Sequence, residues 1–337
     1  MIGTCSAWRL LSQTEGAKID QTVRDGLARS LNVCFERARD SLTCDRNRFL
    51  TFLNEIRDGP VRPAVFGVYT DIVEILTAGD DARLDLLFHS LLDVKPRRTM
   101  TRIVSLSDDD LGTGQAERYA RLLNDDAERR YELLPLEDTF AEAKNRVSSA
   151  LELLGKAVPE LAQEISGLVR EIVLVTDGSS DKPASPNFDG ASTFYLWGAV
   201  FLNAGRATRL DLVQAIAHEA AHLMLFGLMM GQPLTENDSA ERYSSPLRQD
   251  SRPMEGVVHA ANVLVRMSYA LERMLETGLL SPEEQETARA DLDIHRHRFF
   301  DTLPVISEYA RLKPKADEIF SGATEYMREL GPHDPCP

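Results

Sequence analysis

The sequence predicts an α+β protein that is predominantly helical, and three observations support this fold class. Apolar residues recur at spacings of three and four over most of the chain, which is the pattern of amphipathic helices. Two short segments, residues 171–176 and 193–203, are rich in the β-branched and aromatic residues typical of buried strands. The 337 residues are 43% hydrophobic and 27% charged, which excludes extensive disorder and suffices for one or two domains.

The first half of the chain is predicted to be a set of packed amphipathic helices. Turns rich in Asp, Gly and Pro separate them, as at residues 57–60 and 78–81. The acidic run at residues 108–110 is expected to be a solvated loop. The expected helices cover residues 20–39, 64–77, 82–92, 115–134 and 141–154.

The second half is predicted to begin with two strands joined by a long loop and to continue as helices. A polar segment at residues 231–252 is long enough to be a functional loop. We therefore expect a helical N-terminal region, residues 1–165, and a region at residues 166–337 that forms one compact unit. Its expected helices cover residues 210–230, 253–277, 282–302 and 314–330.

Charge and cysteine content exclude several classes of protein. The 53 Asp and Glu outnumber the 38 Lys and Arg, and a net charge of -15 repels phosphate backbones and anionic membrane surfaces. The four cysteines form no CxxC pair and are too sparse for a disulfide scaffold. Without a continuous apolar segment of signal-peptide or membrane-spanning length, the sequence predicts a soluble cytoplasmic protein that binds neither nucleic acid nor membrane.

The pentapeptide HEAAH, residues 218–222, matches the HExxH pattern within a predicted helix. Thr208 and Asp211 resemble a capping box at the helix start. Residues four apart share a helical face, so His218 and His222 can point at one cation with Glu219 beside them. Chance produces this pattern in roughly one sequence in a hundred. The alternative is a pair of hydrogen-bonded core histidines, but a buried helix with two imidazoles and a carboxylate needs strong partners, which a metal supplies.

The helix predicted from residue 253 offers a third ligand. Its polar residues fall at alternating spacings of three and four and form a single stripe on an otherwise apolar cylinder. A solvent-facing stripe should be wider than one row, so we expect this stripe to face the HExxH helix. His259 is then the third metal ligand, with Glu255 as the second choice. The stripe consists of Arg252, Glu255, His259, Asn262 and Arg266.

The arginines favour an oxygenase over a hydrolase. A hydrolytic zinc site needs three ligands, a water and a general base, which Glu219 could be, but no guanidinium groups. Iron with three protein ligands keeps two positions for the keto acid of 2-oxoglutarate and one for dioxygen. The far carboxylate of 2-oxoglutarate favours a bidentate arginine. Arg266 shares the face of His259, while Arg248 and Arg252 lie in the polar segment and at the helix start.

HEAAH together with RYSSPLRQDSRPMEGVVHAANVLVRM resembles the 2-oxoglutarate-dependent HExxH-type peptide β-hydroxylases, which modify ribosomally made peptides. The resemblance covers roughly residues 172–274 and is tightest at residues 218–222 and 245–267. It implies Fe(II) at His218, His222 and His259, with dioxygen as the oxidant. It also implies that Arg248, Arg252 or Arg266 binds 2-oxoglutarate, and that Glu219 orients an imidazole or a bound water.

The implied reaction converts 2-oxoglutarate to succinate and carbon dioxide and places a hydroxyl group on a β-carbon of a precursor peptide. The protein then has only to position that carbon near the iron. An extended peptide is expected to lie along the edge of the strand at residues 193–203.

Two other functions remain open. The first is a zinc metallopeptidase with Glu219 as general base and Glu255 as third ligand. Its metzincin variant requires Gly and a third His soon after His222, where residues 223–226 read LMLF. The second is a non-catalytic peptide-binding protein with a structural metal, but such sites often use Cys, and no cysteine lies near the motif. His295 and His297 are two apart on a predicted helix, so we expect them in a solvated basic patch and not at a metal.

Overall fold

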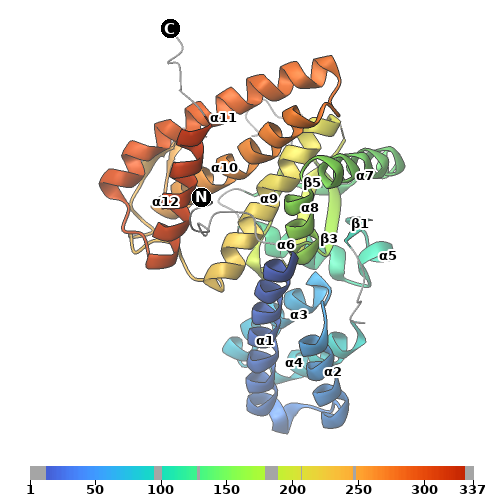
Figure 1. The fold of residues 1–337 in the computed structure, drawn as a ribbon. Helices are drawn as coiled ribbons and strands as arrows, with labels where there is room; N and C mark the ends of the chain where they lie inside the picture. The colour runs from blue at the N-terminus through green and yellow to red at the C-terminus, as the bar shows by residue number, and fades with distance from the viewer. Residues whose placement is uncertain are drawn as a thin grey trace. The chain divides into compact units, whose positions relative to one another are not determined.

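The computed structural model describes residues 13–94, 101–126, 130–178, 189–205, 207–245 and 248–330 (Figure 1). The chain divides into two compact units. The sheet unit comprises Thr14–Val147 and Ser166–Ala207, and the helical unit comprises Ser148–Ile165 and the described part of Thr208–Pro337. The strand region thus belongs with the N-terminal helices, whereas we expected a division near residue 165 with the strands grouped with the HExxH segment.

The sheet unit is built on a small mixed sheet. Three strands run parallel: β1 (Arg102–Ser105), β3 (Glu171–Asp177) and β5 (Ala199–Asn203), with β3 in the middle. β2 (Leu133–Pro135) pairs antiparallel with the end of β3, and β4 (Gly190–Ala191) pairs antiparallel with β5. Because β5 has a neighbour on each side, it does not offer the free edge that we expected for an extended peptide.

Helices surround this sheet and share its hydrophobic core. Val173 of β3, Phe201 of β5 and Tyr119 of α6 are fully buried in one cluster. The predicted helices of this region are present, and a helix that the sequence did not predict, α2, begins after Asp45, whose carboxylate accepts the N–H of Arg48. The helices are α1 (Gln13–Ala38), α2 (Arg46–Asp58), α3 (Pro63–Ala78), α4 (Asp81–Asp93), α5 (Asp108–Leu111), α6 (Gln115–Asp126) and α7 (Phe140–Ala157), with 3-10 turns at Arg39–Ser41 and Phe194–Leu196.

Three local predictions in the sheet unit differ from the structure. The acidic run is a helical turn, α5, because its carboxylates bind nearby amides: Asp108 accepts the N–H of Gly114 and Ala116. The helix expected over residues 115–134 ends at Asp126, and the chain turns into β2. The strand expected from residue 193 begins only at Ala199, because Gly198 adopts a left-handed φ of 88°.

The helical unit is a group of long helices with one small hairpin. In Figure 1, α9, α10, α11 and α12 lie together, and α10 contacts each of the other three. The polar segment at residues 231–252 contains the hairpin, which the sequence did not predict. The elements are α9 (Arg209–Met229), β6 (Tyr243–Ser245), β7 (Arg248–Arg252), α10 (Met254–Thr277), α11 (Pro282–Tyr309) and α12 (Pro314–Glu329). The division between the units falls within α7 and α8 (Pro159–Leu168).

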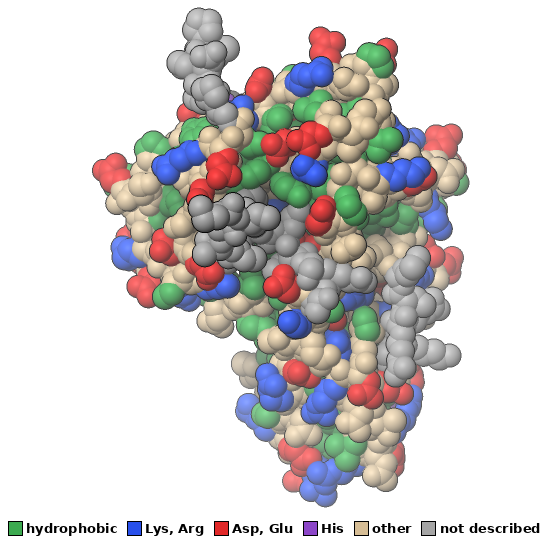
Figure 2. Space-filling model, viewed as in Figure 1, with side chains coloured by type: hydrophobic (Ala, Val, Ile, Leu, Met, Phe, Trp, Pro, Cys, Tyr) green, Lys and Arg blue, Asp and Glu red, His purple; other side chains and the backbone are tan. Residues whose placement is uncertain are grey.

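Helix α9 is the one described helix that is long and apolar enough to cross a membrane by length and composition. Most of its apolar window is buried inside the fold, as in the core helix of a globular protein. Lys, Arg, Asp and Glu side chains are interspersed on the visible face of the described residues (Figure 2), in keeping with the acidic net charge.

His295 on α11 is buried, with 8% of its surface exposed, so its expected place in a solvated basic patch is wrong. Its neighbour in sequence, His297, is half-exposed, with Nε2 3.4 Å from the Asp301 carboxylate. The two side chains point to different surroundings, as their spacing predicts. Burial, with a smaller contribution from Arg298, lowers the pKa of His295 to about 4, while Asp291 acts in the opposite direction.

We expect this histidine to make the protein less stable in mild acid. Its pKa is about 4 when folded and about 6.5 when unfolded, so the full stability is present above pH 6.5 and falls as the pH drops toward 4. The loss is about 1.4 kcal/mol per pH unit within this window. Urea unfolding at pH 7 and pH 5 measures the free energy of unfolding at each pH. Between these two pH values, His295→Gln should lose less of this free energy than the unchanged protein. The same substitution at exposed His297 serves as the control, and equal losses in both variants would contradict the assignment.

Candidate metal centre

Helix α9 presents both motif histidines on one face. The predicted capping box is present: Thr208 Oγ1 accepts the N–H of Asp211, and the Asp211 carboxylate accepts the N–H of Thr208. The helix then continues for 21 residues, until Met230 adopts a left-handed φ of 51°. The four-residue spacing places Nε2 of His218 3.2 Å from Nε2 of His222.

Helix α10 brings His259 against the second of these histidines. Nδ1 of His259 is 2.8 Å from Nδ1 of His222, and the two ring centroids are 5.0 Å apart. His259 is buried, and so are Asn262 and Arg266, which continue its polar stripe into the core. The stripe therefore faces the protein interior from its middle onward. We call His218, His222 and His259 the imidazole row.

His222 is the middle member of this row and directs a different ring nitrogen at each neighbour. His218 and His259 therefore lie on different sides of it. Among the described residues, no group of three or more His, Cys, Asp or Glu side chains is arranged to hold a metal ion as it stands. At least one of the three rings has to turn before the three imidazoles can share one ion.

Two members of the row already fit a common cation. Two nitrogens that each lie about 2.0–2.1 Å from one ion are about 3.3 Å apart in tetrahedral geometry, and the two Nε2 atoms are 3.2 Å apart. Burial lowers the pKa of His222 well below its usual value, and positive charge on His218, His259 and Arg252 would lower it further. His222 is therefore neutral at pH 7, which is the form that binds metals.

Glu255, the second choice for the third ligand, is held away from the pair on α9. Its carboxylate accepts the backbone N–H groups of Leu234 at 2.9 Å and Thr235 at 3.2 Å, and Oε1 lies 3.4 Å from Nε2 of His259. Burial opposes ionisation, but the hydrogen bonds from His259 and the two amides prevail and lower the pKa of Glu255. Glu255 therefore orients His259 so that Nδ1 is the nitrogen that faces His222.

Arg266 is enclosed in the core and already paired. Its Nη2 lies 2.5 Å from Oε1 of Glu164 on α8 and 2.6 Å from Sδ of Met224 on α9. The exposed fractions of the two ionised side chains are 1% and 0%. Nε and Nη1 of Arg266 have no hydrogen-bond partner among the described residues. Because Glu164 neutralises the guanidinium, Arg266 is less suited to bind a carboxylate ligand than the sequence suggested.

Of the two candidate arginines whose side chains the structure describes, Arg252 is the one nearer the protein surface. It ends β7, is only partly buried, and lies close enough for its charge to lower the pKa of His222. Its guanidinium group lies against Gly256 in the first turn of α10. The backbone of Arg248 is in β7, but its side chain lies outside the described part of the structure.

Glu219, the motif carboxylate, is buried beside the first histidine. Its Oε1 is 3.8 Å from Nε2 of His218. From this position a carboxylate can orient that imidazole or a bound water, and a general base in a hydrolase would stand in the same place.

An open hollow of about 210 Å³ adjoins the row on the side of His259. Phe226 and Met229 from the end of α9 line it, together with the segment from Gly231 to Leu234. The ring of Phe226 is 5.5 Å from the His259 ring, between centroids. A mainly apolar wall next to His259 suits an uncharged side chain of a substrate.

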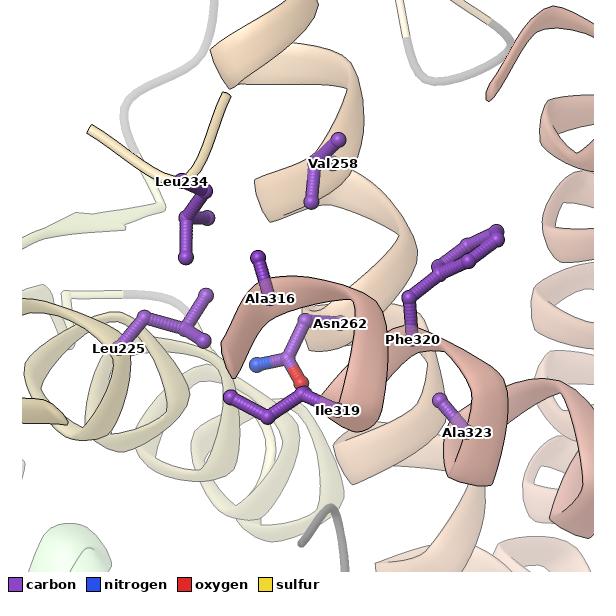
Figure 3. Close-up of a pocket in the computed structure, with 8 residues that line it drawn as sticks. All are labelled: Leu225, Leu234, Val258, Asn262, Ala316, Ile319, Phe320 and Ala323. Atoms are coloured by element: carbon purple, nitrogen blue, oxygen red, sulfur yellow. The ribbon is translucent and has the colours of Figure 1, made fainter. Parts of the chain in front are cut away.

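A smaller cavity of about 10 Å³ lies deeper along α10 (Figure 3). Leu225 and Leu234 line both this cavity and the hollow, and Asn262 is its one polar lining residue. Nδ2 of Asn262 has no hydrogen-bond partner among the described residues. The volume of this cavity is close to that of one water molecule.

Sequence reasoning missed several residues that shape this site. Glu164 lies 102 residues before its partner Arg266, and the amides of Leu234 and Thr235 lie about 20 residues before Glu255. Neither pairing leaves a periodic trace in the sequence. Phe226, one turn beyond His222 on the same face, could have been found from its four-residue spacing.

Compared with models of known protein families and with curated proteins, the chain matches none.

Proposed function

We propose that this protein is a non-heme Fe(II) and 2-oxoglutarate-dependent dioxygenase that hydroxylates a β-carbon in a ribosomally made peptide. The observation that carries the proposal is the imidazole row between α9 and α10, with the guanidinium of Arg252 on the first turn of α10. A metal site with an adjacent cationic group suits an anionic cosubstrate that chelates the ion. HEAAH and residues 245–260, which run from SPLR to HA, resemble the peptide β-hydroxylases, and this resemblance points to the same chemistry.

Each residue of the site would have a separate role in this reaction. His218 and His222 would hold the iron, and His259 would complete the ligand set. Bound iron would supply the activation of dioxygen, coupled to the conversion of 2-oxoglutarate to succinate and carbon dioxide. Arg252 would pair with the far carboxylate of 2-oxoglutarate, because Arg266 is already neutralised by Glu164. Glu219 would orient His218 or a bound water.

The precursor peptide would approach from the open side of the row. The hollow beside His259 is large enough for one apolar side chain and leaves the substrate backbone at the surface. Ribosomally made peptides are available in the cytoplasm, and the buried thiols of Cys34 and Cys44 are free, as that compartment favours. We therefore place the reaction in the cytoplasm.

Turnover of 2-oxoglutarate tests the proposal directly. The protein, purified without oxygen and loaded with Fe(II), should form succinate when oxygen is admitted, and faster when its peptide is present. The peptides encoded beside the gene, coexpressed with the protein, should gain the mass of one oxygen atom. Zinc-dependent cleavage of peptides without succinate would instead identify a metallopeptidase.

The metallopeptidase remains the second candidate because Glu219 is buried next to His218, where a general base would stand. The third ligand in that mechanism would be Glu255. Its carboxylate is occupied by the amides of Leu234 and Thr235 and faces His259. This arrangement disfavours the peptidase, since Glu255 would have to leave three partners to reach a metal.

A further inference from the structure

Gly256 lies in the first turn of α10, one turn after Arg252. A Cβ atom built on it would be 2.9 Å from Nε, 3.0 Å from Cζ and 3.0 Å from Nη2 of Arg252. Real Cβ atoms essentially never approach other heavy atoms closer than 3.0 Å. The guanidinium group therefore occupies the space that any other residue would fill at this position.

No conformational reason for a glycine exists at this point of the helix. The left-handed glycines of the described chain, such as Gly231 and Gly278, do not include Gly256. Its backbone is helical, and a helical backbone gives glycine no intrinsic advantage over alanine. A side chain at position 256 would therefore displace the guanidinium group of Arg252 from its present place.

This contact places the Arg252 guanidinium on the helix that carries His259. Arg252 ends β7, and Pro253 is the N-cap of α10, so the side chain starts at the edge of the site. Packed on Gly256, the guanidinium lies on the first turn of α10, and His259 follows Gly256 by three residues on the same helix. It also keeps access to solvent, since Arg252 is only partly buried.

We propose that Gly256 is the positioning residue of Arg252: it lets the guanidinium lie on the first turn of α10, where it can pair with a carboxylate of a ligand bound at the row. The identity of that ligand as 2-oxoglutarate rests on the proposed function. The position of the guanidinium does not. Gly256→Ala should still fold, because the atoms that must move belong to the far end of a flexible side chain.

The test compares Gly256→Ala with a matched helix glycine in the same unit, Gly155→Ala on α7, whose Cβ would meet nothing within 4 Å. Calorimetry with 2-oxoglutarate and the Mn(II)-loaded protein, without oxygen, measures ligand affinity apart from turnover. Loss of a charge-assisted hydrogen bond corresponds to about 10- to 100-fold weaker binding, and we expect this loss for Gly256→Ala only. Mn(II) affinity should be the same in both variants.

A double-variant cycle with Arg252→Ala shows whether Gly256 acts through Arg252. In the Arg252→Ala protein, adding Gly256→Ala should weaken 2-oxoglutarate binding no further. Additive losses would overturn the proposal, since the new methyl group would then act on something else. An unchanged affinity in the single Gly256→Ala variant would overturn it as well.

A second readout keeps this inference separate from the proposed function. The Nε–Hε resonance of Arg252 in a ¹⁵N-labelled sample should shift in Gly256→Ala and stay in place in Gly155→Ala. If 2-oxoglutarate does not bind to the unchanged protein, the proposed function fails, and this resonance alone decides the positioning role. A resonance that does not move in Gly256→Ala overturns it.

Discussion

Replacing His222 with alanine is expected to abolish tight binding of Fe(II) and, with it, succinate formation. His222 is the member of the row that touches both others, so its removal deletes one nitrogen donor and releases the side chains of His218 and His259. Loss of a residue that only orients a ligand typically costs 10- to 100-fold in metal affinity. Because His222 would itself be a ligand in the proposed site, we expect a loss of more than about 100-fold.

The variant His259→Ala measures the contribution of His259, the third histidine of the row, to metal affinity. As a ligand, His259 should give a loss comparable to that of His222→Ala; a loss confined to about 10- to 100-fold would show that it only orients His222. Competition with a chelator of known affinity gives the metal dissociation constant of each variant. His297→Ala is the control, since that side chain is half-exposed on α11. If His297→Ala and His222→Ala weaken metal binding equally, the imidazole row does not bind the metal.

The second large effect is expected for Arg266→Met, which should lower the free energy of unfolding by about 3–5 kcal/mol. The substitution leaves Glu164, with no exposed surface, as a buried carboxylate without its cation. Leaving one partner of a buried ion pair alone costs far more than removing both. Methionine fills much of the volume of the arginine stem, so a cavity adds little to the loss.

The double variant Arg266→Met with Glu164→Leu separates the ion pair from packing. It should recover most of the stability lost in the single variant, because no uncompensated charge remains. Urea unfolding of the three proteins measures the effect. If the single variant loses less than about 1 kcal/mol, the pair is solvated as an exposed pair would be. If the double variant is no more stable than the single one, the loss comes from packing.

Helices and their caps were predictable because their determinants are local. The capping box of Thr208 and Asp211 and the spacing of His218 and His222 are fixed within a few residues of chain, and the structure contains both. The confirmed fold class, predominantly helical with a small sheet, follows from the same local patterns. Local reasoning was wrong where a side chain meets nearby backbone amides, as Asp108 does in α5.

The site was predictable only in part, because its finer geometry depends on partners far apart in the chain. The single polar stripe on α10 indicated that His259 faces α9, and in the structure His259 contacts His222 of α9. The polar stripe on α10 did not indicate that Arg266 forms an ion pair with Glu164. Nor did it indicate that Glu255 binds the amides of Leu234 and Thr235. Those pairings are set by tertiary packing, which one sequence does not encode periodically.

The two halves of the site rest on elements of very different local stability. His218 and His222 belong to a long helix whose side chains are largely buried, and such an element opens only with a free energy near that of global unfolding. Arg252 belongs to a hairpin of two short strands, the kind of element that opens at much lower energy. In the proposed enzyme, the histidines on α9 would therefore stay in place during turnover, while Arg252 sits on the element that yields more easily, so entry and release of an anionic ligand would depend on the hairpin side of the site.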